Sequence, residues 1–160
     1  MRGYTLLELL VVTFIFAIII AGVFAVLNTT SMTWNSTIGN LQLEQGVRLA
    51  MDGLTRETRG CKANQVTVNN GGARLDFYVP DIAPILSYYL LNNQLIREYP
   101  AGTVKVVANN INNLSFCCVG GADCVDCANA NSLLIQINAY KNVRGIPLSF
   151  SLKEQVKLRN

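Results

Sequence analysis

An uninterrupted apolar run near the start of the chain constrains the fold more than any other feature. From Leu9 to Leu27 the sequence contains no charged residue, and Thr13 is the only clearly polar member of the run. A helix of this length can span the hydrocarbon core of a bilayer. The chain has 160 residues, and those outside the run have the composition of a small globular domain. The sequence therefore predicts one membrane anchor followed by one domain.

Glu8 stands directly before this run, where a carboxylate is costly. An ionised carboxylate at the centre of a bilayer costs roughly 2.5–3.5 kcal/mol even on insertion scales, so such a residue usually has a partner. Nearby in sequence, only Arg2 and the amino terminus are cationic. A cleaved secretory signal would need a shorter apolar core and a small-x-small site, which the segment 28–32 does not supply. A plain uncleaved anchor explains the apolar run but leaves Glu8 unexplained.

The segment Gly3-Tyr4-Thr5-Leu6-Leu7-Glu8-Leu9 resembles the prepilin processing motif of type IV pilins and type II secretion pseudopilins. The resemblance implies that a membrane aspartic protease, the prepilin peptidase, cuts after Gly3 and that the new amino terminus of Tyr4 is methylated. Glu8 then becomes the fifth mature residue, where the family has a glutamate that pairs with the terminal amine of a neighbouring subunit. Residues 1–3 are accordingly predicted as a short leader and residues 4–27 as a transmembrane helix.

Residues 28–60 predict a continuation of the same helix. The segment opens with polar residues that alone would indicate a linker, but an amphipathic pattern resumes further on and ends before Gly60, a reasonable helix stop. The apolar stripe comprises Leu43, Val47, Ala50, Met51 and Leu54, and the opposite face carries Gln45, Arg48, Asp52, Arg56 and Arg59. Gly39, Gly46 and Gly53 recur every seven residues. They either permit close helix approach in a filament or, in the interpretation we favour, simply weaken the helix.

Residues 61–160 predict a β-rich head. Apolar residues alternate on both sides of the turn at 69–72 and again around Asn92-Asn93, which indicates two hairpins. Two further one-sided strands follow, around residues 133–139 and 148–158. One-sided alternation predicts an antiparallel sheet with one covered face, and the amphipathic helix is the expected cover. The predicted fold class is α+β, the long helix packed against an antiparallel β-sheet head, as the resemblance to the pilin fold also implies.

The head carries a second resemblance, to the J-type minor pseudopilins and the related W-type minor pilins. The segments that carry it are Tyr88-Tyr89-Leu90, Gln94-Leu95-Ile96-Arg97, Val106 to Phe116 (its motif running from Asn110), and the closing Leu158-Arg159-Asn160. This resemblance implies a minor subunit that joins other minor pseudopilins in a tip complex from which filament assembly starts.

Five cysteines follow the apolar run: Cys61, Cys117, Cys118, Cys124 and Cys127. If the head lies outside the cytoplasm, disulfides are expected, but four clustered cysteines allow three connectivities and Cys61 is left over. Zinc is the less favoured alternative, because adjacent cysteines are a poor half-site. The acids Asp123 and Asp126 with Asn129 and Asn131 match no calcium loop. We therefore predict no metal and no cofactor.

The composition also bears on the class of function. There is no histidine, the commonest general base, and the net charge of +3 is scattered without a basic stripe, so neither an enzyme nor a nucleic-acid-binding protein is predicted. The main hypothesis is a structural minor subunit of a type II secretion pseudopilus or type IV pilus. The resemblance implies as partners other minor and major pilins, the prepilin peptidase, membrane lipid and an inner-membrane assembly platform.

The expected location follows from the same resemblance. It is the bacterial inner membrane, crossed once, and Arg2 favours a cytoplasmic amino terminus. The head would then be periplasmic, or extracellular in the assembled filament. The alternative from another class is a membrane-anchored extracytoplasmic binding or adhesin domain.

Overall fold

A computed structural model describes residues 5–79, 82–121, 123–125 and 127–159. The chain divides into two compact units, residues 1–38 and residues 39–160. One long helix, α1 (Leu6–Arg59), contributes to both. Within the described residues it begins at Leu6, inside the predicted segment 4–27, and it ends at Arg59, directly before Gly60.

The amino-terminal unit is helical from Leu6 to its last residue, Ile38. Its apolar side chains, from Leu6 to Leu27, are exposed, and by length and composition this part of α1 could cross a membrane. The threonines that follow do not break the helix. The hydroxyls of Thr29, Thr33 and Thr37 each donate to the carbonyl oxygen four residues earlier, at 2.9–3.0 Å. The hydroxyls are thus satisfied by the helix itself, which explains why a segment with the composition of a linker remains helical.

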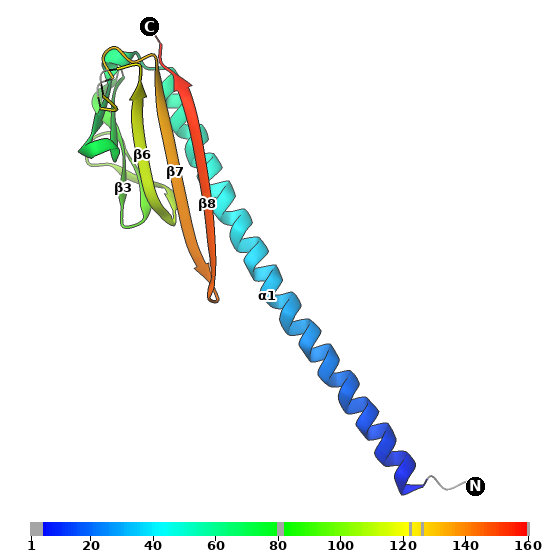
Figure 1. Ribbon diagram of the computed structural model, residues 1–160. Helices are drawn as coiled ribbons and strands as arrows, with labels where there is room; N and C mark the ends of the chain where they lie inside the picture. Colours follow the sequence, from blue (N-terminus) through cyan, green and yellow to red (C-terminus); the bar gives the residue numbers. More distant parts are fainter. Residues whose placement is uncertain (1–4, 80–81, 122, 126, 160) are drawn as a thin grey trace. The chain divides into compact units, whose positions relative to one another are not determined.

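The head contains two antiparallel sheets. The first has five strands in sequence order: β1 (Val66–Asn69), β2 (Arg74–Val79), β3 (Ile82–Leu91), β4 (Gln94–Glu98) and β5 (Val104–Asn109). The second has three: β6 (Ile111–Val119), β7 (Ser132–Val143) and β8 (Ile146–Lys157). Two short 3₁₀ turns, Ala63–Gln65 and Asn70–Gly72, flank β1. Figure 1 shows β6, β7 and β8 side by side, with the later turns of α1 along one face of this sheet.

The core lies between the sheets and the second half of α1. The five residues of the predicted helical stripe are each 4% exposed or less, and they share one core cluster with inward residues of both sheets. Along β7 the inward residues Leu133, Ile135, Ile137 and Ala139 are buried as their alternation predicted. The predicted α+β class and the antiparallel head, with the helix as its cover, are therefore confirmed.

The division of the head into two sheets is the main difference from the prediction. Neither β5 nor β6 was predicted as a strand. The segment across their junction carried only the second family resemblance. A single residue, Asn110, separates the two strands, and its φ of 62° turns the chain out of the first sheet and into the second. Asparagine tolerates this left-handed conformation better than most residues, because its short polar side chain can bond locally.

The three evenly spaced glycines do not share one environment. A β-carbon added at Gly39 would lie 2.9 Å from Leu148 Cδ1 and 3.0 Å from Val143 Cγ2, whereas at Gly46 and Gly53 it would meet nothing within 4 Å. Within this chain, close packing accounts for Gly39 alone, and its neighbours Leu148 and Val143 belong to strands of the head. At Gly46 and Gly53 the structure gives no packing reason for glycine.

Candidate assembly and processing site

Glu8 lies in the first turn of α1. Its backbone N–H donates to the carbonyl oxygen of Thr5 at 3.0 Å and to Thr5 Oγ1 at 3.4 Å, as expected for the unsatisfied first amides of a helix. Its side chain is exposed, and in the described part of the chain no lysine or arginine lies within ion-pair distance of it. Among the described residues, the Glu8 carboxylate therefore lies beside exposed apolar side chains without an ion-pair partner, and a carboxylate in such a position usually has a cationic partner.

The predicted processing residues Gly3 and Tyr4 lie outside the described residues. Glu8 is therefore the part of the predicted site whose surroundings can be described.

A polar cluster in the head joins the helix to the first sheet through Glu57, a residue that sequence analysis missed. The hydroxyl of Tyr88 donates to Glu57 Oε2 at 2.6 Å. Arg97 donates to Glu57 Oε1 through Nε at 3.1 Å and Nη2 at 2.9 Å. Tyr88 is 2% exposed. Its burial, followed by the hydrogen bond and negative charge of Glu57, raises its pKa above the ordinary value and keeps it a neutral donor.

This cluster gives a physical role to two residues of the second resemblance. Tyr88 comes from β3 and Arg97 from β4, and these two residues lie directly opposite each other across the strand pair. Both hold the same carboxylate near the end of α1. In the sequence, Glu57 is only an acidic residue on an amphipathic helix. Its partners could not be predicted, because Tyr88 and Arg97 are far away in the chain.

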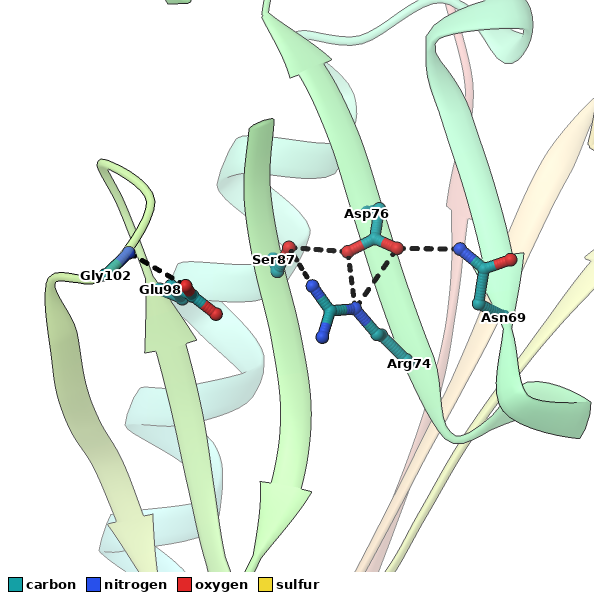
Figure 2. Close-up of polar contacts among 6 residues, drawn as sticks. All are labelled: Asn69, Arg74, Asp76, Ser87, Glu98 and Gly102. Carbon is teal, nitrogen blue, oxygen red and sulfur yellow. Dashed lines mark hydrogen bonds and ion pairs between the residues drawn. The ribbon is translucent and has the colours of Figure 1, made fainter. Parts of the chain in front are cut away.

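A second polar network links β1, β2 and β3 on the outward face of the five-stranded sheet (Figure 2). Asp76 accepts hydrogen bonds from Asn69 Nδ2 at 2.7 Å, from Arg74 Nε at 2.9 Å and from the hydroxyl of Ser87. Arg74 Nη2 also donates to Ser87 Oγ at 3.0 Å. Glu98, on the neighbouring strand, accepts from the backbone N–H of Gly102 and closes the turn after β4. These groups satisfy one another, which fits a structural role.

Two disulfides clamp the loop between β6 and β7. Cys117 is joined to Cys124, and Cys118 is joined to Cys127. Adjacent residues of a strand point to opposite faces, so the two bridges leave opposite faces of β6. Cys118 and Cys127 are each 3% exposed, whereas Cys117 is half-buried and Cys124 is exposed. Cysteines paired in this way have no thiolate to offer to a zinc ion.

Cys61 is the free cysteine among the described residues, and it is buried. Its thiol donates to the carbonyl oxygen of Glu57 at 3.4 Å. Burial, followed by the negative charge of Glu57, raises the pKa of this thiol. A buried neutral thiol is a poor nucleophile, so Cys61 has the properties of a packing residue.

The exposed bridge yields a stability prediction. We expect Cys117→Ser/Cys124→Ser to lower the free energy of unfolding by about 2.5 kcal/mol, because loop-closure entropy returns to the unfolded chain. Thermal unfolding of the full chain in detergent, followed by circular dichroism, measures the change. Ser149→Ala, at an exposed position of β8, is the matched control. A double variant as stable as this control would contradict a stabilising role for the bridge.

Comparisons with known proteins bear on the amino terminus. Residues 1–24 match the family described as the prokaryotic N-terminal methylation motif. No curated protein and no solved structure matches the chain. The motif, the long amino-terminal apolar helix and the antiparallel β head together support the conclusion that the chain is a membrane-anchored, pilin-like subunit. They favour a structural role over catalysis.

Proposed function

We propose that the chain is a minor subunit of a type II secretion pseudopilus or type IV pilus. The observation that carries this proposal is the methylation motif over residues 1–24, in which Glu8 has no ion-pair partner among the described residues and stands at the start of an exposed apolar helix. The prepilin peptidase cuts after Gly3, and the methylated amine of Tyr4 becomes the mature amino terminus. The mature subunit is held in the inner membrane by α1, with its head outside the cytoplasm. It assembles there with other minor and major pilins on a membrane platform.

Within this class we propose a place in the tip complex that starts filament assembly. The support is the resemblance to J-type pseudopilins and W-type pilins, together with the cluster in which Tyr88 and Arg97, two residues of that resemblance, bind Glu57. The disulfide-clamped loop after β6 fits a head that is exposed to an oxidising compartment.

The test is the intact mass and amino-terminal residue of the membrane-extracted protein. We expect a chain that begins at methylated Tyr4 when an active prepilin peptidase is co-expressed, and a chain that retains residues 1–3 when the peptidase is catalytically inactive. An unprocessed chain in the presence of active peptidase would overturn the proposal and favour the membrane-anchored binding domain instead.

A further inference from the structure

The outward face of the three-stranded sheet segregates charge in a way that the linear sequence conceals. Burial alternates along the end of β8 and just beyond it. Val156 and Leu158 are buried at 1% and 2% exposure, while Lys153, Lys157 and Arg159 are exposed. Glu154, the one acidic residue of β6, β7 and β8, falls on the opposite parity and lies 3.6 Å from Arg59 of α1. The row is not evident along the linear sequence, where the charges look scattered, because every second residue of a strand shares a face.

The side chains of this basic row, Lys153, Lys157 and Arg159, have no ion-pair partner in the part of the chain that the structure describes. Lys62, on the chain after α1, lies beside Arg159 through an isolated parallel bridge and extends the positive charge. At about 3.3 Å per strand residue, the cations from Lys153 to Arg159 span roughly 20 Å. A row of this length fits an extended anionic polymer better than a single small anion.

Neutral hydrogen-bonding groups lie beside the cations. In the register of β7 and β8, Gln136 is opposite Lys153, and Asn138 is opposite Ser151. Ser151 Oγ donates to Asn138 Oδ1 at 2.6 Å, which fixes the amide and leaves its Nδ2 donor without a partner among the described residues. Side-chain hydroxyl and amide groups can bind sugar hydroxyls, because each of these groups can act as a hydrogen-bond donor and as an acceptor.

The same face disfavours two other occupants. Single-stranded nucleic acids stack their bases on aromatic side chains, but Tyr140 is the one aromatic residue on the outward rows of these three strands. Protein interfaces have an apolar centre from which charged residues are depleted, whereas lysine, serine and amide side chains dominate here.

We propose that the outward face of β7 and β8 binds an acidic polysaccharide. Lys153, Lys157 and Arg159 pair with carboxylates along the polymer, and Asn138 and Ser149 bind its hydroxyls. Gln155 contributes its Oε1 acceptor, because its Nε2 donates to Ser132 Oγ at 2.7 Å. This surface gives the assembled subunit a ligand of its own, beyond its role in assembly.

Binding of oligogalacturonate to the full chain in non-ionic detergent tests the proposal, measured by biolayer interferometry. We expect Lys153→Gln/Lys157→Gln to weaken binding at least tenfold at low ionic strength, and salt to weaken binding to the unaltered chain. Arg56→Gln/Lys105→Gln, which removes the same charge from exposed positions of α1 and β5, should bind as the unaltered chain does. All four side chains are exposed, so both variants should fold.

Four results would overturn the proposal. The first is no binding at low salt. The second is an equal loss in both double variants, which would indicate a net-charge effect. The third is a preference for an oligodeoxythymidylate of equal charge, which would assign the face to nucleic acid. The fourth is unaltered binding with new self-association in Lys153→Gln/Lys157→Gln, which would mean that these lysines only blunt an edge strand. Dextran, which lacks carboxylates, should bind far more weakly than oligogalacturonate.

Discussion

Glu8→Ala is expected to leave processing intact and to reduce incorporation into a pilin complex at least tenfold. Glu8 has no cationic partner in the described part of the chain, and exposed apolar residues follow it directly. If the mature terminal amine of a neighbouring subunit pairs with it, each group neutralises the other within the membrane. An uncompensated charge in the bilayer costs roughly 2.5–3.5 kcal/mol, which exceeds the 1.4 kcal/mol that corresponds to a tenfold loss.

The measurement is co-purification of the tagged full chain with its partner pilins from membranes, normalised to the amount of processed protein. Glu8→Asp keeps the charge on a shorter side chain and should retain part of the incorporation. Glu44→Ala is the matched control, because Glu44 is an acid of α1 in the head that pairs with Arg48 at the helix surface. Undiminished incorporation of Glu8→Ala would refute the intersubunit ion pair. If Glu8→Ala were not processed, its loss of incorporation would reflect the missing cleavage and not the missing ion pair. Measuring processing in the same variant therefore distinguishes failure of the ion pair from failure of the proposed function.

The periodicity of the sequence predicted the elements whose burial is one-sided. The stripe from Leu43 to Leu54 predicted the covered face of α1, because helical spacing admits no other arrangement of those side chains. The turn at Asn92-Asn93 predicted the hairpin of β3 and β4, and both asparagines have positive φ, 49° and 60°. In each case the signal lies within a dozen residues. Such local signals are what a single sequence can supply.

Features that depend on distant residues were not predictable in the same way. The junction at Asn110 assigns β5 and β6 to different sheets, yet nothing local to the segment distinguishes a change of sheet from a turn within one. The disulfide partners of Cys117 and Cys118 depend on the path of the loop, since adjacent strand residues face opposite ways. The basic row along the end of β8 and just beyond it was recoverable in principle, because Lys153, Lys157 and Arg159 share the same parity in the sequence.

Glu57→Ala should lower the free energy of unfolding of the head by about 3 kcal/mol. The substitution leaves the buried hydroxyl of Tyr88 without its acceptor, and an unsatisfied buried polar group costs about 1–3 kcal/mol. It also removes both hydrogen bonds from Arg97, whose side chain is 27% exposed, so that solvent screens part of the loss. Asp52→Ala, at an exposed acid of the same helix, is the matched control and should change stability by less than about 0.5 kcal/mol.

A double-mutant cycle separates the orphaned hydroxyl from the lost ion pair. Tyr88→Phe removes the hydroxyl alone and should cost about 1 kcal/mol. In the Tyr88→Phe background, Glu57→Ala no longer orphans a buried donor, so its cost should fall by about 1 kcal/mol or more. Thermal unfolding of the full chain in detergent, followed by circular dichroism, gives the four stabilities. Additive effects would show that Tyr88 and Glu57 act independently. If Glu57→Ala destabilised the head no more than Asp52→Ala does, Glu57 would not be among the residues that hold α1 to the first sheet.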